Sequence, residues 1–475
     1  MNEKQFGFRA GRSTIDALQA VVNKAKEEKQ KSSKTRNHCL LITIDVQNAF
    51  NSASWNVILE ELRARNVSGY LQNIISDYLR DRWIVDEEEQ MWEMTCGVAQ
   101  GSIIGPLLWN ILYDGVLQLQ LPEGVTTVAY CDDLALTVVA KTTAQLKILA
   151  EEALAVIANW MKKHGLNLVP EKSEMILLSG KKKADPFSVE FLGRELKPGK
   201  NLKYLGVNLD SNLSFDHHLT ETTNRASAVI CQVARLMPNT RGPGEKKRRI
   251  LSSVAESIIL YAVPVWKEAF GVKKYRKKAE AVQRKAALRI IRGYRTIGVE
   301  PARVLARTIP IDILAEERIS LLNKEASRTE LRNRSLESWQ ARWDNYEGSS
   351  WTKKLIRNIR TWFERKHGEV TFHFTQYVTG HGCFKFYLHS IKKADTPYCD
   401  YCEDEEDDTP YHTLFECPRW SSEREQLEAE VSHNLEPENL IDEMLSSPSK
   451  WAAIEKIVSK ILSQKEENER KEQNK

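Results

Sequence analysis

Two neighbouring carboxylates, Asp132 and Asp133, interrupt the apolar stretch VTTVAYCDDLALTVVA at residues 125–140. Adjacent like charges repel each other, and a divalent cation relieves that repulsion. A plain Asp-rich hairpin turn is the alternative, and it is the better interpretation of two aspartates taken alone. Because β-branched and apolar residues flank the pair on both sides, we expect two buried strands that meet at this polar break.

A third carboxylate, Asp45, closes the buried-strand pattern LLITID at residues 40–45. Taken alone, Asp45 would be interpreted as a cap for the helix that follows. Together with Asp132 and Asp133 it gives three carboxylates at strand ends, which are suitable ligands for Mg²⁺. Phosphoryl transfer uses such a site for two Mg²⁺ ions: one activates the attacking hydroxyl, and the other stabilises the leaving oxygens.

A glycine-rich segment, GVAQGSIIGPLLWNILY, covers residues 97–113. Gly101, Gly105 and Pro106 precede an apolar helical pattern, and glycines before a helix let backbone amides approach a nucleotide closely. An ordinary helix start with proline in its first turn explains the same residues. Spacing alone leaves both interpretations open.

Three cysteines and one histidine near the C-terminus have the spacing of a metal site. The four residues are Cys399, Cys402, His412 and Cys417. Three thiolates and one imidazole complete a tetrahedral Zn²⁺ site without an open position, so this would be one structural zinc ion. Unrelated free cysteines on a loop are the alternative. The six acidic residues 403–408 would repel phosphate, so any nucleic-acid contact of this knuckle is expected from Arg419 and Trp420.

A strongly basic helical segment runs from Lys273 to Arg295, with ten Lys or Arg residues and one acid, Glu280. Four of its cations share one helical stripe: Lys278, Lys285, Arg289 and Arg292. Such a stripe opposite an apolar one predicts a helix that lies along a duplex backbone. A solvated charged face is the alternative.

Composition excludes several classes of protein. The chain has 475 residues, 41% of them hydrophobic and 28% charged, which excludes whole-chain disorder, collagen-like chains and coiled-coil rods. Its formal net charge is only +4. Eight cysteines are too few for a disulfide scaffold and indicate a reducing compartment. No apolar run approaches the ~18 residues of a membrane span, and the first residues lack the apolar region of a secretory signal.

Patterning along the chain predicts five segments. A mixed α/β region is expected at 1–215, with helices near 14–29, 55–62, 107–119 and 143–163 and one strand at 203–210. A basic helical region is expected at 216–340, an aromatic-rich, irregular connector with some helix at 341–395, the Cys/His knuckle at 396–420, and a helical or disordered tail at 421–475. The charged end, residues 464–475, is expected to fray.

Six motifs occur in the order and approximate spacing of reverse transcriptase motifs. They are FGFRAGRST (6–14), IDVQNAFNSASW (44–55), GVAQGSIIGPLLWN (97–110), AYCDDLAL (129–136), LVPEKSEMI (168–176) and LKYLGVNLD (202–210). In detail the chain resembles the reverse transcriptases of non-LTR, LINE-type retrotransposons. Its C-terminal part is similar to the type-1 elements of arthropods that insert into ribosomal DNA. The resemblance covers most of the chain.

The resemblance implies roles for individual residues. Asp45, Asp132 and Asp133 match the metal-binding aspartates of the polymerase palm. The other matched positions are Val46 (carbonyl facing the metal), Phe50 (aromatic gate against a ribose 2′-hydroxyl), Gln100 and Gly101 (template and incoming base), Tyr130 (first residue of the Tyr-x-Asp-Asp motif), Lys172 (near the triphosphate), and Tyr204, Leu205 and Gly206 (primer grip).

Three departures from the family pattern stand out. Ala99 replaces the usual proline, which is expected to cost loop rigidity, and Cys131 replaces the commoner alanine between Tyr130 and Asp132. The family's earlier finger motifs and its endonuclease would lie upstream of Met1. The chain is therefore expected to be a fragment of a larger polyprotein.

The resemblance implies a right-hand α/β polymerase with a palm and partial fingers, an α-helical thumb and a zinc knuckle. It implies an RNA-directed DNA polymerase that copies element RNA from dNTPs, using nicked target DNA as primer. A nuclear location at the integration site follows, with a cytoplasmic ribonucleoprotein stage and no membrane partner. A non-catalytic RNA-binding relic is one rival, which the intact Asp45, Asp132 and Asp133 disfavour. A protein similar to group II intron maturases is another, which the Cys/His cluster disfavours.

Overall fold

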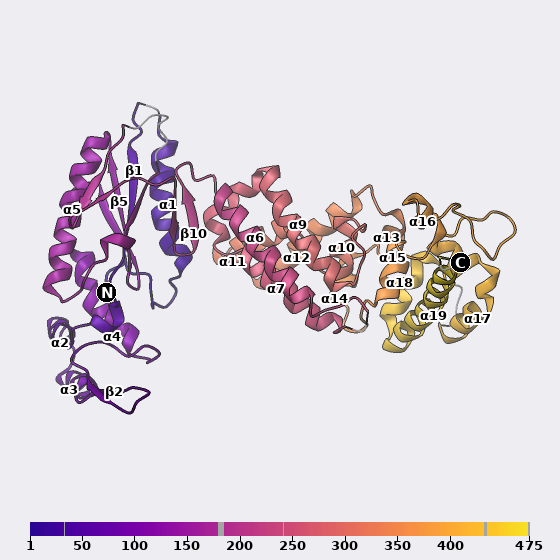
Figure 1. Ribbon diagram of the computed structural model, residues 1–475, viewed down its shortest axis with the longest axis horizontal. Coiled ribbons are helices and arrows are strands. Elements are labelled where there is room, and N and C mark those ends of the chain that lie inside the picture. Colours follow the sequence, from indigo (N-terminus) through magenta and orange to yellow (C-terminus); the bar gives the residue numbers. More distant parts are fainter. Residues whose placement is uncertain (33, 179–184, 241, 432–434, 474–475) are drawn as a thin grey trace. The chain divides into compact units, whose positions relative to one another are not determined.

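The computed structural model describes residues 1–32, 34–178, 185–240, 242–431 and 435–473 (Figure 1). The chain divides into two compact units. Unit 1 comprises Met1–His218 with Pro264–Trp266, and unit 2 comprises Leu219–Val263 with Lys267–Lys475. The boundary at 218 lies close to the one expected at 215. Nearly all of the basic region and the three segments expected after it belong to unit 2.

Unit 1 is built on a four-stranded antiparallel sheet in the order β4-β5-β1-β6. The strands are β1 (His38–Ile44), β4 (Val125–Tyr130), β5 (Asp133–Ala140) and β6 (Glu174–Leu177). β1 is the run that precedes Asp45, and β4 and β5 are the two strands expected on either side of the aspartate pair. Since β1 lies between β5 and β6, it is buried along almost its whole length.

Two long helices cover this sheet, as the expected patterns at 14–29 and 143–163 predict. The sheet stands between α1 (Thr14–Gln30) and α5 (Thr143–Lys163) in Figure 1. α1 begins at a capping box in which Ser13 and Asp16 satisfy each other's backbone N–H groups. The side chain of Thr142 caps α5 in a similar way, by accepting from the Gln145 N–H.

The other elements of unit 1 are short. They are η1 (Ala49–Ser52), α2 (Trp55–Ala64), α3 (Gly69–Leu79), β2 (Trp83–Val85), β3 (Met91–Glu93), α4 (Gly105–Tyr113), η2 (Asp114–Gln118), η3 (Pro170–Lys172), β7 (Val189–Phe191), β8 (Arg194–Leu196), β9 (Asn201–Tyr204) and β10 (Val207–Asp210).

Two local expectations in unit 1 were wrong in detail. The single strand expected at 203–210 is the hairpin β9–β10, whose turn residues Leu205 and Gly206 have φ of 43° and 81°. Glycine adopts a positive φ without steric cost, so the Leu-Gly pair makes a tight turn instead of continuing a strand. The helix expected at 107–119 is α4 followed by the 3₁₀ turn η2, because the α-helical pattern ends at Tyr113.

Unit 2 is helical. Its elements are α6 (Asp216–Ala234, from Leu219 on), α7 (Glu245–Ile259), η4 (Lys267–Gly271), α9 (Lys273–Ile290), α10 (Val299–Ala306), α11 (Ile311–Leu322), α12 (Arg328–Asp344), α13 (Ser350–Leu355), α14 (Ile359–Glu364), α15 (Phe372–Thr379), α16 (Lys385–Ser390), η5 (His412–Glu416), η6 (Pro418–Trp420), α17 (Ser421–Val431), α18 (Pro437–Ser446) and α19 (Pro448–Gln473). The short helix α8 (Val263–Trp266) lies at the second boundary between the units.

A single hydrophobic core joins the C-terminal half of unit 2. It runs from the end of α9 through Trp339, Trp362 and Phe374 to residues of α19. The connector expected to be irregular with some helix at 341–395 therefore contributes helices α13–α16 and buried aromatic side chains to this core. The large aromatic residues that made this segment look irregular are the ones that pack it.

The expectation that residues 464–475 fray was wrong for the described part of the tail. α19 continues to Gln473, and Lys465 within it is only 7% exposed. Its ammonium forms a buried ion pair with Asp408, and Glu466 accepts a hydrogen bond from Gln376. Charge pattern alone could not reveal these tertiary partners.

No single described helix has both the length and the apolar composition to cross a membrane. One bent pair of helices, 245–259 with 263–271, meets both criteria together.

Candidate functional site

The sheet register brings the three predicted carboxylates together. In the antiparallel pairing of β1 with β5, Ile44 lies opposite Leu134, so the next position places Asp45 beside Asp133. Tyr130 pairs with Asp133 across the β4–β5 turn, which leaves Cys131 and Asp132 as the turn residues. The short loop thus presents Asp132 next to Asp133, and the neighbouring strand adds Asp45.

The charges of these carboxylates are poorly compensated by the protein. Burial, followed by the charges of Asp132 and Asp45, raises the pKa of Asp133 to about 6. The pKa of Asp132 is raised by burial and by the charge of Asp45. Lys172, on the turn η3, places its ammonium 3.3 Å from Asp45 Oδ2. One lysine for three carboxylates leaves a net negative site at the end of the sheet.

The donor set fits divalent cations. Asp45 Oδ2 is buried and has no hydrogen-bond partner among the described residues, although it lies near the Lys172 ammonium. A buried oxygen without a partner is costly unless a ligand satisfies it. Because hard carboxylate oxygens are the ligands that Mg²⁺ prefers, these three side chains are suitable for holding it.

The backbone carbonyl of Val46, next to Asp45, is not used in the pairing with Leu168 and is available as a further metal ligand. Two hydrogen bonds bracket Val46: Val169 N–H donates to Asp45 O at 3.0 Å, and Gln47 N–H donates to Asn167 O at 2.8 Å. In an antiparallel bridge with this pattern the central residue turns its own carbonyl away from the bonded partner. The Val46 carbonyl therefore points away from Leu168, its bridge partner on the β6 side of β1.

A buried glutamine that the sequence analysis missed holds the Cys131–Asp132 turn. Gln5 Nε2 donates to the Cys131 carbonyl at 3.2 Å, and the Cys131 N–H donates to Gln5 Oε1 at 3.1 Å. The same Oε1 accepts from the Gly7 N–H at 2.9 Å. Cys131 has a φ of 58°, an uncommon conformation for a residue with a side chain, and both of its backbone polar groups bond to Gln5. Gln5 thus fixes the turn that carries Asp132.

Gly7 allows the N-terminal segment to approach this turn. A Cβ atom at Gly7 would lie 2.2 Å from the Cys131 nitrogen, so any other residue would push the two segments apart. The Gly7 carbonyl accepts from Asn110 Nδ2 at 2.9 Å. Residues 5–7 therefore support the Cys131–Asp132 turn, a role that their sequence did not indicate.

We predict that Gln5→Ala lowers kcat by about tenfold or more, because displacing reacting groups by about 1 Å can cost 10²-fold. The loss of buried hydrogen bonds should also lower the free energy of unfolding, by about 1–3 kcal/mol for each backbone group left unpaired. Steady-state primer extension and thermal unfolding measure the two effects. Gln118→Ala is the matched control, since Gln118 bonds Asp114 and not the turn. Parental kcat in Gln5→Ala would show that the turn holds its geometry unaided.

An aromatic stack links the predicted sugar gate to the same turn. Phe50 stacks on Trp109 with centroids 5.3 Å apart, and Trp109 stacks on Tyr113 at 5.0 Å. The Tyr113 hydroxyl donates to the Asp132 carbonyl at 3.2 Å. The Phe8 ring lies edge to face with the Phe50 ring, with centroids 6.0 Å apart. Trp109 and Tyr113 are one helical turn apart on α4, which is the only signal in the sequence that could have suggested the stack.

Gln100 and Gly101 lie in the exposed loop that leads into α4. This loop is tied to the Phe50 segment, because the Val98 N–H donates to the Phe50 carbonyl at 2.8 Å. Gly101 has a φ of 84°, so the turn needs glycine there. Both residues thus follow a strand-like segment that is anchored beside the predicted gate.

Tyr204, expected to grip the primer, has a buried side chain that is 3% exposed. Its hydroxyl has no hydrogen-bond partner among the described residues, and burial with the nearby charge of Asp133 raises its pKa well above the ordinary value. The expectation of a surface contact from this side chain is therefore wrong. Tyr204 is buried within reach of the charge of Asp133, and Gly206 in the hairpin turn is exposed.

The expected basic stripe is also different in the structure. Lys278 Nζ donates to Thr220 Oγ1 at 2.6 Å and Lys285 Nζ donates to Ser227 Oγ at 2.9 Å, so both face the neighbouring helix α6. Arg292 lies beyond the end of α9 with a φ of 58° and bonds the Pro243 carbonyl. Helical spacing correctly placed Lys278 and Lys285 on one face of α9, but that face contacts α6.

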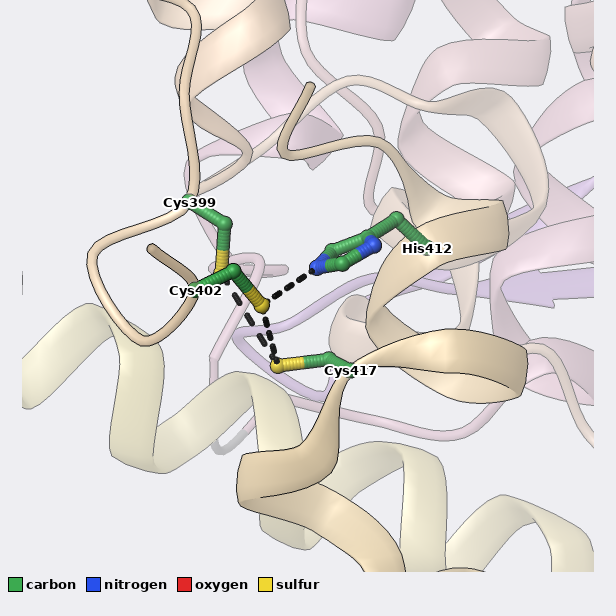
Figure 2. A group of neighbouring side chains, drawn as sticks. All are labelled: Cys399, Cys402, His412 and Cys417. Carbon is green, nitrogen blue, oxygen red and sulfur yellow. Dashed lines mark hydrogen bonds between the residues drawn. The ribbon is translucent and has the colours of Figure 1, made fainter. Parts of the chain in front are cut away.

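The four zinc-ligand candidates converge in unit 2. Their ligand atoms all lie within 4.8 Å of one another (Figure 2). The Cys399 and Cys417 sulfurs are 3.8 Å apart, the Cys402 and Cys417 sulfurs 4.0 Å, and Cys402 Sγ is 3.4 Å from His412 Nε2. Tetrahedral Zn²⁺ with Zn–S of about 2.3 Å requires a sulfur–sulfur distance of about 3.8 Å. The geometry of this Cys₃His cluster is compatible with zinc.

Two expectations about the surroundings of this cluster were wrong. Asp408, the last of the six acidic residues, is 2% exposed and bonded to Lys465, so it does not contribute to a repulsive surface. Trp420, expected to contact nucleic acid, is 1% exposed, and the Arg419 guanidinium lies over its ring at 4.8 Å. Asp408 and Trp420 are buried because the cluster is embedded in the core of unit 2 and is not an isolated knuckle.

Comparison with known proteins identifies the first part of the chain. Residues 1–209 match the family described as "Reverse transcriptase (RNA-dependent DNA polymerase)". Over 450 residues the chain is 27% identical to a putative 115 kDa protein in a type-1 retrotransposable element of Drosophila melanogaster, covering 89% of this chain and 43% of that protein. It is 24% identical to the Pol polyprotein of the type-1 element R1 from Bradysia coprophila, covering 89% of this chain and 44% of that protein.

A further relative is covered almost completely. The Pol polyprotein of the type-1 element R1 2 from Nasonia vitripennis is 23% identical over 78% of this chain and 97% of that protein. A telomerase structure from Candida tropicalis aligns with a TM-score of 0.35 and 12% identity over 69% of this chain and 57% of that one, values too low to carry an argument. The chain spans less than half the length of the first two relatives.

The family match covers the carboxylate site, and the relatives extend the similarity across unit 2. Residues 1–209 therefore match a reverse transcriptase domain, and the chain is similar over most of its length to proteins of type-1 retrotransposable elements.

Proposed function

We propose that this chain acts as an RNA-directed DNA polymerase that extends a primer by phosphoryl transfer at Asp45, Asp132 and Asp133. The observation that carries the proposal is the register of the strands, which places these three carboxylates at one end of the sheet with only the Lys172 ammonium, 3.3 Å from Asp45 Oδ2, paired to them among the described residues. The test is dNTP incorporation on a primed RNA template with Mg²⁺. No incorporation by the folded chain under these conditions would contradict it.

The side chains have separate tasks in this reaction. When bound, two Mg²⁺ ions would activate the primer 3′-hydroxyl and stabilise charge on the phosphates. Asp45, Asp132 and Asp133 would hold them, and the Val46 carbonyl points to a position where it can add a ligand. Lys172 is 69% exposed on its side chain and can turn from Asp45 toward a triphosphate. Gln5 and Tyr113 act as positioning residues for Asp132 through the backbone.

The non-catalytic relic is the rival function. A relic has no need to keep three carboxylates close together, since the arrangement raises the pKa of Asp133 and costs stability without a bound cation. The shared support of the turn by Gln5 and Tyr113 also favours a working site. Primer extension separates the two functions directly.

The remaining parts of the proposal concern partners and location. We propose element RNA as template, nicked target DNA as primer and dNTPs as substrates; the match to a reverse transcriptase family supports an RNA template and nucleotide substrates. Under this proposal the chain works at the chromosomal integration site, after a cytoplasmic ribonucleoprotein stage. Unit 2 supplies the thumb and holds one structural Zn²⁺ at Cys399, Cys402, His412 and Cys417.

Phe50 is proposed as the gate against ribonucleotides. We predict that Phe50→Val relaxes sugar selection by about tenfold or more, because the smaller side chain leaves room for the 2′-hydroxyl. The measurement is the ratio of kcat/KM for a dNTP to that for the matching rNTP. Phe8→Val is the control, since Phe8 contacts the edge of Phe50 within the same stack. An unchanged ratio in Phe50→Val would mean that Phe50 only packs on Trp109.

A further inference from the structure

A basic cavity of about 640 Å³ lies within unit 2, and neither the motifs nor the comparisons assign it a role. It is open to solvent on one side and is lined by α7, the end of α9, α11, the start of α12, the segment 307–309 and Phe363. Six cationic side chains line it: Lys246, Arg249, Arg307, Arg318, Arg328 and Arg332. Among the described residues, two carboxylates, Glu256 and Glu317, also line it. The wall therefore carries four more positive than negative groups.

Neighbouring carboxylates hold part of this cationic set in place. Glu245, buried behind the wall, lies 2.9 Å from Arg307 and 3.7 Å from Arg249, but it also pairs with the buried Arg365 at 3.0 Å. Arg249 further donates to the carbonyls of Ala306 and Arg307. One carboxylate shared by three guanidinium groups fixes their positions, but it neutralises only one of the three positive charges.

Arg332 pairs with Glu317 at 2.7 Å, but two other cations of the wall are less compensated. Lys246 and Arg328 are exposed at the cavity and form no ion pair with a described residue. Burial raises the pKa of Glu256. Burial, followed by repulsion from Arg307, lowers the pKa of Arg249, as expected where like charges are crowded. The Arg307 Nε is buried without a hydrogen-bond partner among the described residues.

We propose that this cavity binds the phosphate groups of a nucleic-acid strand. Guanidinium groups match phosphate oxygens in a planar, two-point geometry, and a concave wall of one charge concentrates the field on an anion. A volume of 640 Å³ exceeds the space that one phosphate needs, and Ile250 and Leu321 at its wall offer exposed apolar surface to a sugar or base. The inference rests on the proposed function, in which unit 2 holds template or primer.

This site differs from the basic stripe of α9. Lys278 and Lys285 of that stripe bond α6, whereas Lys246 and Arg328 are free of ion pairs within the described chain. The cavity is therefore the better candidate for backbone contact in unit 2.

The test measures binding of a labelled primed RNA template to the full chain at several salt concentrations, without Mg²⁺. The triple variant Lys246→Gln, Arg318→Gln, Arg328→Gln should bind at least tenfold more weakly. The slope of log affinity against log salt should fall by about two to three units, one for each lost phosphate contact. The double variant Lys246→Gln, Arg328→Gln changes only exposed residues and should lose about two-thirds of that slope, which keeps the test valid where Arg318→Gln disturbs folding.

A matched control removes the same charge elsewhere on unit 2. Lys366→Gln, Lys392→Gln, Lys456→Gln changes three exposed lysines outside the cavity and should leave the slope nearly as in the parent. Equal losses in the cavity and control variants would overturn the proposal, because net charge would explain both. Displacement by polyglutamate but not by an unlabelled RNA strand would overturn it in favour of an acidic protein. Incorporation of dNTPs by the parent is measured alongside: incorporation without a difference in binding between cavity and control variants means that only this site fails, whereas no incorporation by the folded parent means that the polymerase assignment fails.

Discussion

Asp132→Asn is expected to lower the rate of dNTP incorporation by about 10³-fold or more. Metal-assisted charge stabilisation supplies several kcal/mol to phosphoryl transfer, and each 1.36 kcal/mol corresponds to a factor of ten. The substitution keeps the size of the side chain, so the turn held by Gln5 and Tyr113 should remain folded. Single-nucleotide incorporation on a primed RNA template with Mg²⁺ measures the effect.

The same variant has an expected signature in stability against pH. The pKa of Asp133 is about 6 in the folded protein against 3.8 ordinarily, so the folded state binds this proton more tightly. Stability without metal must then fall as pH rises from about 4 through 6, since the unfolded state binds fewer protons. Removing the charge of Asp132 lessens the repulsion. The metal-free variant should therefore melt above the parent at pH 7 and close to it at pH 4.

Asp77→Asn is a suitable control, because Asp77 is an exposed carboxylate on α3. It should leave incorporation and the pH profile as in the parent. Rates near the parental value in Asp132→Asn would remove this aspartate from the metal site. The repulsion argument would be contradicted if the melting temperature of the variant, taken relative to that of the parent, were lower at pH 7 than at pH 4.

Cys417→Ser is expected to abolish binding of one Zn²⁺ per chain and to loosen the C-terminal half of unit 2. Cys417 is fully buried, and its sulfur lies within 4.0 Å of two other ligand sulfurs. Structural zinc sites contribute about 10–16 kcal/mol of binding free energy that acts as folding free energy. The cluster shares its core with α17–α19, so the loss should spread along that core. Metal analysis and hydrogen exchange measure the two effects.

Hydrogen exchange should distinguish the two units in this variant. Amides of α19 should lose protection, while those of β1 and α1 in unit 1 should keep it, because unit 1 has its own core. Cys231→Ser is the control, since Cys231 is an exposed cysteine outside the cluster. Parental zinc content in Cys417→Ser, or a zinc content near zero in the parent purified without chelator, would refute the site.

Local sequence was sufficient for the elements with strong periodicity. The helices at 14–30 and 143–163 and the strands around Asp132 and Asp133 were predicted because each has its own pattern of apolar residues and, for the helices, a capping residue at the start. The ligand sets were predictable for a related reason. Metal chemistry restricts both residue type and spacing, so the Cys/His cluster is recognisable before its folding is known.

Residues that act through contacts distant in sequence were not predictable in this way. Gln5 and Cys131 are 126 positions apart, and Lys465 is 57 positions from Asp408. An isolated glutamine or lysine in a polar stretch has the appearance of a solvated residue. The basic stripe failed similarly, because helical spacing defines a face but not what that face packs against.

The sequence by itself determined which groups can hold metal ions, since carboxylate pairs and Cys/His spacing are local properties of the chain. Only the tertiary structure decided how those groups are held and which cations remain free. The register of β1 against β5 sets Asp45 beside Asp133, and the N-terminal segment fixes the turn. Packing of α6 on α9 engages Lys278 and Lys285, whereas the cavity cations in unit 2 exceed their carboxylates. Burial and pairing between distant segments decide such outcomes, because they change the solvation and charge of a side chain without changing the sequence around it.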